Sequence, residues 1–265
     1  MIRLLSPVSP FIMISAFCLF CSVSPARAES VPLPPPLRAT IAKLQTHSPT
    51  LVLPAFLGIP YRNDGTINDA GEYATFNDPG KVLSEPGLNC SGLVLAATRI
   101  VFGKNIPLAA AVRDRHNDSG PAAPLGQDWD FGFDLISNLA DIAGGRLLVP
   151  EGAAMPATTT GQTAPSFDLH DPLFGADFPA LIRTGHLYLV SFSRHESPAA
   201  PARLHYHVGA VVRDGETVWL YSTTRNSKRA IRIDLASDEG LALFRKSYRN
   251  TKGSFKRLTV VEIPL

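Results

Sequence analysis

The sequence predicts an α+β fold in which a helix packs against an antiparallel β-sheet. From Leu93 to Phe102, apolar residues recur with the spacing of a helix that buries one broad face. The last third of the chain holds several short runs rich in β-branched and aromatic residues, which are typical of strands. Asp214-Gly215 stands between two of these runs and predicts a hairpin, which joins antiparallel neighbours.

The first 28 residues have the features of a secretory signal peptide. Arg3 precedes an apolar run from Phe11 to Val23, and Ala26-Arg27-Ala28 offers small residues at both recognised positions of a cleavage site. We therefore expect a mature chain that begins at Glu29 and is periplasmic or secreted in a bacterium. Because the apolar run is short for a bilayer span, no stable membrane insertion is expected after cleavage.

The composition of the mature chain argues against some classes of function. Without the two arginines of the signal, the 25 Lys and Arg become 23, against 23 Asp and Glu. This balance argues against a nucleic-acid binder, which would show a concentrated basic surplus, and it indicates no particular protein partner. Cys18 and Cys21 leave with the signal, so Cys90 becomes the one thiol in a compartment where cysteines usually pair. An unpaired exported thiol suggests a chemical role.

The remaining chain is long enough for one sizeable core and has no internal repeat. We expect a single domain at 29–265 with a long insertion at about 104–184. The stretch 106–180 is rich in Pro, Gly, Thr and Ala and is expected to be irregular, except for a helix from Phe133 to Ala143 closed by Gly144-Gly145. Its aromatic residues are expected to fold back as one wall of a cleft. The other expected elements are a helix at 37–44, a packed apolar segment at 51–57, and strands at 185–192, 207–212, 217–223, 230–235 and 258–263.

Cys90 stands at the start of the predicted helix. Asn89 is a favourable N-cap, so Cys90 falls in the first turn, where free backbone N–H groups and the helix dipole stabilise a thiolate. We expect its pKa to lie below the value of about 8.5 for a free thiol. Gly92 removes side-chain bulk near the sulfur, so that a strand or substrate approaches closely, and Gly103 ends the helix. The alternative is an inert buried cysteine, which is common for this residue type.

Three stretches resemble a known family. Asn89-Cys90-Ser91-Gly92-Leu93-Val94 is similar to the Asp-Cys-Ser-Gly-Leu-Val nucleophile motif of NlpC-type cysteine peptidases, papain-like enzymes that cut peptides in bacterial cell walls. The run Gly58 to Gly65 resembles the Gly-x-Pro-Tyr-x-x-Gly-Gly turn upstream of that motif, and His207-Val208-Gly209 resembles the family's His-Val-Gly strand. The resemblance implies a papain-like fold and an exported thiol hydrolase that cleaves amide bonds, with peptidoglycan stem peptide as the favoured substrate and with no cofactor.

The same resemblance implies roles for individual residues. Cys90 is the expected nucleophile and His207 the base that removes its proton and later protonates the leaving amine. Tyr61 and Ser91 are expected to bind substrate. Gly209 is expected to leave room for the helix that carries Cys90.

Two positions depart from the family pattern. The family most often uses a histidine on the strand after the catalytic histidine to orient the base, and residues 217–223 contain none. Ser222 is our candidate for this role, with Tyr221 or the more distant Asn226 as alternatives; each can form one hydrogen bond but none carries a charge. The second departure is Asn89, which replaces an aspartate that in some members recognises a free substrate amine.

Two other classes of function remain open. His205 is expected to share a strand face with His207. Together with His186 or His195, this pair would form a three-histidine zinc site of a different kind of hydrolase. The other class is a catalytically inactive module that binds cell wall. Chelator sensitivity would indicate the first, and binding without turnover the second.

Overall fold

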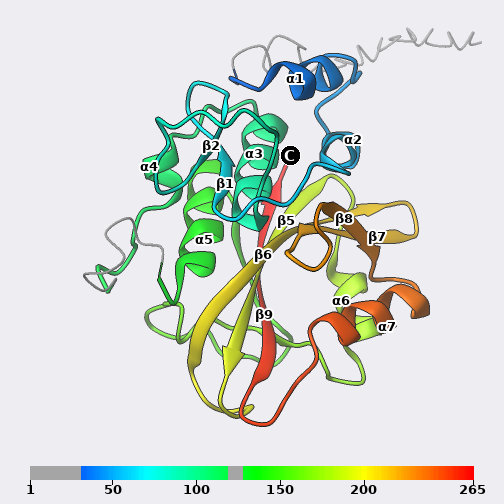
Figure 1. Cartoon of the computed structure of the whole chain (residues 1–265). Coiled ribbons are helices and arrows are strands. Elements are labelled where there is room, and N and C mark those ends of the chain that lie inside the picture. The colour runs from blue at the N-terminus through cyan, green and yellow to red at the C-terminus, as the bar shows by residue number, and fades with distance from the viewer. Residues whose placement is uncertain (1–30, 119–127) are drawn as a thin grey trace, which may run out of the picture.

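The structure, a computed structural model, describes residues 31–118 and 128–265; the expected signal peptide lies outside the described residues. A central sheet separates two layers of helices (Figure 1). Helices α3 (Cys90–Phe102) and α5 (Phe131–Ala143) cover one face, and α6 (Phe174–Leu181) and α7 (Asp238–Ser247) cover the other. The predicted α+β class, with the cysteine-bearing helix on an antiparallel sheet, is confirmed.

Within the described residues the central sheet has seven strands, in the order β3-β9-β5-β6-β7-β8 with β4 also paired to β9. All of these pairings are antiparallel. The strands are β3 (Arg146–Leu148), β4 (Phe167–Asp168), β5 (His186–His195), β6 (Ala202–Asp214), β7 (Thr217–Thr223), β8 (Ala230–Asp234) and β9 (Phe255–Pro264). The five strands expected from the sequence are β5 to β9. Asp214 pairs with Thr217, so the hairpin turn is the two-residue loop Gly215-Glu216, in which Gly215 has a φ of 59° that favours glycine.

The middle of the chain is more regular than expected. Helix α5 ends at Ala143 as predicted, and Gly144 follows it with a φ of 83°. However, β3 and β4 add strands along β9, and α6 and the short α4 (Leu108–Ala111) lie in the same part of the chain. The expectation of an irregular stretch was wrong here because strands of two or three residues are too short to leave a periodic pattern.

The N-terminal elements support α3. Helix α1 (Pro35–Ile41) matches the helix expected at 37–44, and α2 (Pro49–Val52) with the 3-10 helix η2 (Leu53–Phe56) forms the packed apolar segment. These elements contribute Leu37, Ile41, Val52, Leu53 and Phe56 to the core that also contains the buried face of α3. A two-stranded sheet of β1 (Gly65–Ile67) and β2 (Tyr73–Thr75) lies beside the start of α3.

The start of α3 is fixed by the residues that the sequence indicated. The Asn89 side chain accepts a hydrogen bond of 2.8 Å from the Gly92 N–H, and Gly103 ends the helix with a φ of 57°. A Cβ atom at Gly92 would lie 2.2 Å from the Gly65 carbonyl oxygen. Gly92 therefore lets β1 lie directly against the first turn of α3, which holds that turn in place.

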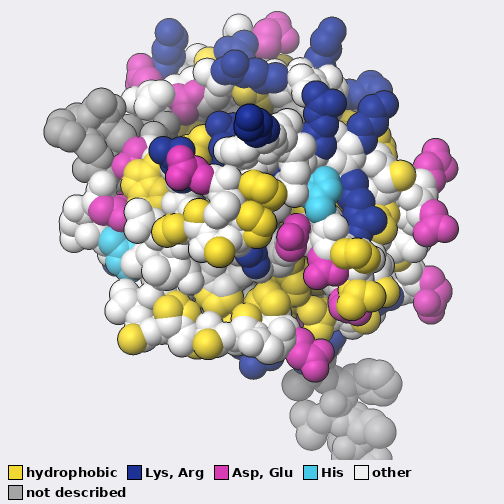
Figure 2. All heavy atoms as spheres, turned by 90° about the horizontal axis from the view of Figure 1, so that it is seen from below, with side chains coloured by type: hydrophobic (Ala, Val, Ile, Leu, Met, Phe, Trp, Pro, Cys, Tyr) yellow, Lys and Arg dark blue, Asp and Glu magenta, His cyan; other side chains and the backbone are white. Residues whose placement is uncertain are grey.

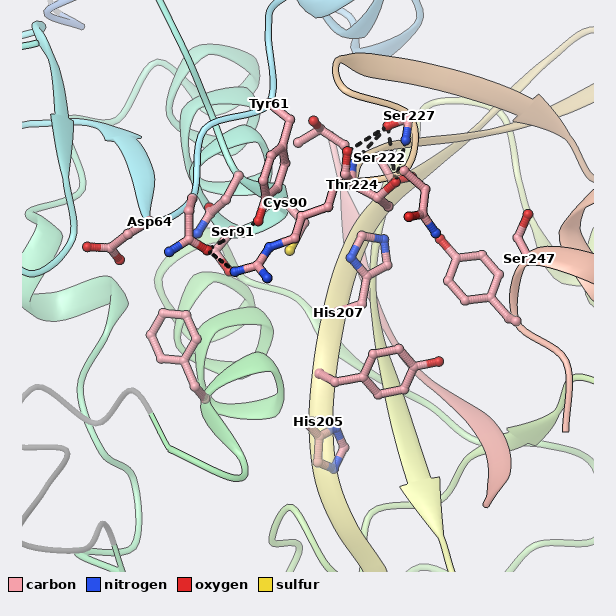
Figure 3. Close-up of a pocket in the computed structure, with 18 of the residues that line it drawn as sticks. Tyr61, Asp64, Cys90, Ser91, His205, His207, Ser222, Thr224, Ser227 and Ser247 are labelled. Carbon is pink, nitrogen blue, oxygen red and sulfur yellow. Dashed lines mark hydrogen bonds between the residues drawn. The ribbon is translucent and has the colours of Figure 1, made fainter. Parts of the chain in front are cut away.

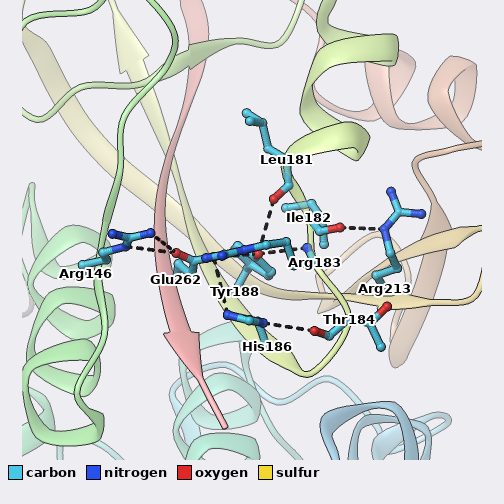
Figure 4. Close-up of polar contacts among 9 residues, drawn as sticks. All are labelled: Arg146, Leu181, Ile182, Arg183, Thr184, His186, Tyr188, Arg213 and Glu262. Carbon is cyan, nitrogen blue, oxygen red and sulfur yellow. Dashed lines mark hydrogen bonds and ion pairs between the residues drawn. The ribbon is translucent and has the colours of Figure 1, made fainter.

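A buried carboxylate organises the opposite side of the sheet, near the end of β9 (Figure 4). The side chain of Glu262 is 2% exposed and accepts hydrogen bonds from Arg183, from Arg146 Nε at 3.1 Å and from the Tyr188 hydroxyl at 2.9 Å. Burial alone would raise the pKa of Glu262, but these hydrogen bonds outweigh it and hold the pKa below its usual range. No helix in the part of the chain that the structure describes is long and apolar enough to span a membrane.

Candidate active site

A cavity of about 990 Å³ lies where the first turn of α3 meets β6, β7 and the C-terminal end of α7. All five residues that the sequence singled out line it: Tyr61, Cys90, Ser91, His207 and Ser222. Figure 3 shows the sulfur of Cys90 and the ring of His207 pointing toward each other from α3 and β6. The structure therefore brings together residues that are as much as 161 positions apart, Tyr61 and Ser222.

Cys90 is partly exposed and is the free cysteine of the described residues. Burial raises the pKa of the thiol, but the nearby His207, the Val208 backbone and the Ser91 side chain favour the thiolate and lower the pKa to about 7. The direction is the expected one, and the largest favourable cause is His207. At neutral pH a large fraction of Cys90 is therefore thiolate, the nucleophilic form.

His207 is held by aromatic packing. Its side chain is buried, and its ring centroid lies 5.1 Å from that of Phe192 and 5.7 Å from that of Tyr248, with the latter ring nearly parallel at 26°. Its Nε2 atom is buried and has no hydrogen-bond partner among the described residues. Cys90 on one side and two aromatic rings on the other therefore set the orientation of the imidazole.

A β-bulge separates His207 from His205. In the β5–β6 register His207 pairs with Phe192 and His205 pairs with Ser193, so that Tyr206 is an extra residue. His205 consequently lies on the α5 side of the sheet, 5.6 Å from the ring of Phe133, whereas His207 lies on the Tyr248 side. The expectation that the two histidines share a face was wrong because strand alternation fails across a bulge.

Both ring nitrogens of His205 are used in the fold. Nε2 donates to the Gly161 carbonyl oxygen at 2.7 Å, and Nδ1, 2.8 Å from the Ser191 hydroxyl, accepts from it. Burial lowers the pKa of His205 to about 4, so the ring is neutral at pH 7. Through these hydrogen bonds His205 holds the segment around Gly161 against the sheet.

The histidines do not form the alternative zinc site. His195 binds the Ala200 carbonyl oxygen through Nδ1 and the Ser193 hydroxyl through Nε2. His186 lies near Glu262, with Nδ1 donating to the Thr184 carbonyl oxygen. Nowhere in residues 31–118 and 128–265 do three His, Cys, Asp or Glu side chains lie close enough to hold one metal ion. The zinc-site hypothesis was wrong on this geometry.

Ser222 lies in the cavity wall on β7 and is buried. It lies near Tyr248 and acts against the rise in the pKa of Tyr248 that burial causes. Tyr221 lies in the core on the α3 side and bonds to Arg232, whereas Asn226 lines the cavity. The role of Ser222 in orienting His207 stays a prediction, and its contact with Tyr248 makes that role indirect.

Gly209 has a different purpose from the one expected. A Cβ atom there would lie 2.8 Å from Cδ1 of Leu220 and 3.0 Å from the Tyr221 carbonyl oxygen, so the free space is taken by β7 and not by α3. Helix α3 reaches His207 instead because β7 pairs with β6 only from Ala210 to Asp214 in the described register. The backbone of Val208, which lies beyond that pairing, contributes to lowering the pKa of Cys90.

A polar rim surrounds Cys90 and His207 in the cavity. The Tyr61 hydroxyl donates to Asn63 Oδ1 at 3.3 Å, and Arg225 donates to the same oxygen at 2.9 Å. Asp64 lies on the side of Cys90 away from His207 (Figure 3). Burial raises the pKa of Asp64, and hydrogen bonds from Asn77 act against this rise. The rim thus offers a cation, a carboxylate and several amides to a polar ligand.

Sequence reasoning missed the rim residues Asn63, Asp64 and Arg225 and the two tyrosines beside His207, Tyr206 and Tyr248. The rim residues lie in turns, where polar side chains are the norm, so no pattern marked them. Tyr206 lines the cavity because of the bulge, and a bulge has no signature in a single sequence.

No family model matches the chain, and no curated protein matches it in sequence. It is similar to three crystal structures of an N-acetylmuramoyl-L-alanine amidase from Bacteroides uniformis ATCC 8492. Two have 14% identity, with TM-scores of 0.40 and 0.42, and cover 87% and 80% of this chain and 98% of each amidase chain. The third has 13% identity and a TM-score of 0.38, covering 84% of this chain and 96% of that one. Likeness at this level assigns neither family nor function.

Proposed function

We propose that the chain is an exported cysteine hydrolase that cleaves amide bonds in peptidoglycan stem peptides, with Cys90 as nucleophile and His207 as general base and acid. The observation that carries this proposal is the pairing of the two side chains within one cavity, where His207 and hydrogen bonds bring the pKa of Cys90 to about 7. The motifs around Cys90 and His207, which resemble those of NlpC-type peptidases, support the choice of substrate.

In the first half of the proposed reaction, the Cys90 thiolate attacks the carbonyl carbon of the scissile amide. The negative charge that forms on the carbonyl oxygen lies beside the first turn of α3, whose N–H groups and dipole stabilise it. The C–N bond then breaks while protonated His207 gives its proton to the departing nitrogen. The products are a free amine and a thioester on Cys90.

In the second half, His207 takes a proton from a water molecule, whose oxygen attacks the thioester carbon. The C–S bond breaks, the acid product leaves, and the proton held by His207 balances the charge of the regenerated thiolate. Packing against Phe192 and Tyr248 keeps the imidazole in place through both transfers. The predicted substrate contacts of Tyr61 and Ser91 flank this path, because both residues line the same cavity.

The test is digestion of purified muropeptides by the mature protein, read by mass spectrometry. Parent protein, alkylated parent protein and Cys90→Ala are compared, and we expect new amine and acid termini only with the unmodified parent. Turnover that persists in Cys90→Ala would overturn the cysteine mechanism. Tight muropeptide binding by the parent without cleavage would indicate a binding module instead.

The reactivity of the thiol gives a second measurement that needs no substrate. The rate of iodoacetamide alkylation should rise with an inflection near pH 7, because the pKa of Cys90 is lowered to about 7. In His207→Phe the inflection should move to higher pH, since the largest favourable influence on the thiolate is lost. An inflection near pH 8.5 in the parent would contradict the pairing of the two residues.

A further inference from the structure

Two positive side chains, Arg194 and Lys256, lie next to each other near Tyr206, which lines the cavity. They are direct partners in the β5–β9 register, and both lie near the ring of Tyr206. The distance to the ring centroid is 5.7 Å from Arg194 Cζ and 5.2 Å from Lys256 Nζ. Like charges directly opposite each other destabilise a sheet, whereas the cation–π contacts with Tyr206 act in the opposite direction.

No acidic side chain of the described residues forms an ion pair with either cation. The Lys256 ammonium donates to the neutral hydroxyl of Ser254. Burial lowers the pKa of Lys256, and the positive charge of Arg194 lowers it further. A bound anion would favour both charged forms and remove the cost of their proximity.

The surrounding chain adds positive charge. The stretch 245–257 holds six basic and no acidic residues: Arg245, Lys246, Arg249, Lys252, Lys256 and Arg257. Arg245 and Arg257 donate to backbone carbonyl groups and so serve the fold. Lys246, Arg249 and Lys252 are exposed and, among the described residues, have no acidic partner. Figure 2 shows that, on the face seen from below, Lys and Arg side chains gather in the upper half.

Tyr206 links this positive charge to the reacting pair. It precedes His207 directly, and its ring lines the same cavity as Cys90. Ser247 and Tyr248, which belong to the basic stretch, also line that cavity. Tyr206 therefore borders both the cavity that contains Cys90 and the Arg194 and Lys256 side chains.

We propose that Arg194 and Lys256 form a subsite for an anionic group, a carboxylate or a phosphate, carried by the molecule whose amide bond lies at Cys90. The guanidinium offers paired donors that suit either anion, and the ammonium adds a compact charge. Calling that molecule a substrate rests on the proposed function, whereas binding of the anion does not. Anion binding selects substrates that are charged on the Tyr206 side of the scissile bond.

The test measures binding to the mature protein carrying Cys90→Ala, so that bound material is not consumed. Calorimetry compares muropeptides with free carboxyl groups, the same muropeptides after chemical amidation, and inorganic phosphate. Each ligand is titrated into three proteins that all carry Cys90→Ala. The first has no other change, the second also carries R194Q and K256Q, and the third is a matched control in which two exposed lysines are changed, K43Q and K81Q. The melting temperature of the R194Q/K256Q protein should equal or exceed that of the Cys90→Ala protein, because two neighbouring positive charges are removed. A loss of binding in R194Q/K256Q is then not a loss of folding.

The carboxylate form of the proposal predicts that amidation weakens binding by about tenfold or more, and that R194Q/K256Q abolishes this difference while the control keeps it. If amidation has no effect but phosphate binding is lost in R194Q/K256Q alone, the subsite binds the phosphate of a phosphorylated substrate. If neither ligand distinguishes R194Q/K256Q from the control, the subsite is refuted, even when the parent cleaves muropeptides. If muropeptides do not bind but phosphate binding depends on the pair, the substrate assignment fails and the subsite stands.

Discussion

Glu262 on β9 and His207 on β6 are both buried polar residues of the central sheet, and they differ in how their polar atoms are satisfied. Glu262 has two arginines and a tyrosine hydroxyl as partners (Figure 4). His207 has a buried Nε2 atom without a partner among the described residues, and its other contacts are a thiol and two aromatic rings. A buried polar atom without a hydrogen bond destabilises the folded state by about 1–3 kcal/mol, so the two centres cannot serve the same purpose.

The difference indicates that the Glu262 centre stabilises the fold, whereas the His207 centre is suited to proton transfer. The Glu262 centre joins β9, β5 and β3 and holds its carboxylate charged, which is what a structural cluster requires. The His207 centre leaves an imidazole free to gain and lose a proton next to a thiol, at a cost to the fold. Substitutions at the first centre should therefore lower stability without lowering activity, and substitutions at the second should lower activity without lowering stability.

The largest expected effect is at His207. His207→Phe keeps a ring between Phe192 and Tyr248 but removes the base, so muropeptide turnover should fall by about a thousandfold. The melting temperature should stay the same or rise, because a buried nitrogen without a partner is removed. Turnover by mass spectrometry and thermal unfolding by circular dichroism measure the two quantities on one sample. If His207→Phe unfolds at a lower temperature than the parent but keeps its turnover per folded molecule, His207 serves stability and not activity, contrary to this prediction.

The sequence predicted the parts of this picture that depend on local patterns. The N-cap Asn89, the close approach at Gly92 and the end at Gly103 follow from side-chain chemistry within one helix, and all three are confirmed. The five strands β5 to β9 carry enough β-branched residues to be recognised. Cys90 was singled out by its place at the start of the helix and by its motif, and His207 by a motif that resembles the same family; their catalytic roles stay predictions.

What the sequence did not predict depends on register and on distant contacts. The extra residue Tyr206 places His205 and His207 on opposite faces, and only the pairing with β5 determines this. The partners of Glu262 come from β5, from the segment before it and from β3, so no single stretch of sequence indicates the cluster. Likewise, the side chain of Leu220 occupies the space at Gly209, and this could be predicted only from the position of β7.

His205 provides the next test, because it is a buried histidine two residues from His207 that is fully bonded. His205→Gln should lower the free energy of unfolding by about 2 kcal/mol, since the Gly161 carbonyl and the Ser191 hydroxyl lose their partner. Turnover per folded molecule should change little, and His47→Gln, at a half-buried histidine, is the matched control.

The pH dependence identifies His205 as the cause. Its pKa is about 4 in the folded state and about 6.5 when unfolded, so between these values the unfolded state binds more protons. The stability contributed by neutral His205 is present above pH 6.5 and is lost as the pH falls toward 4. Urea unfolding at several pH values should show this loss in the parent and a flatter profile in His205→Gln. If the free energy of unfolding falls equally steeply with decreasing pH in the two proteins, a group other than His205 controls the loss of stability in acid.

The smallest expected effect is at Glu262, where Glu262→Gln keeps the shape of the side chain but removes its charge. An amide oxygen in place of Oε1 still accepts from the Tyr188 hydroxyl and from Arg183, so the loss is that of the charge and of the hydrogen bond from Arg146 to Oε2, and it should be about 1–2 kcal/mol at pH 7. Because the folded-state pKa of Glu262 lies below its unfolded value, the charged form contributes stability above about pH 4.3, and this contribution is lost as the pH falls further. The difference between parent and variant in urea unfolding should therefore shrink below pH 4, whereas Glu216→Gln in the exposed hairpin loop should show no such trend. Muropeptide turnover by folded Glu262→Gln should equal that of the parent; a loss of turnover without a loss of stability would show that the two polar centres are coupled.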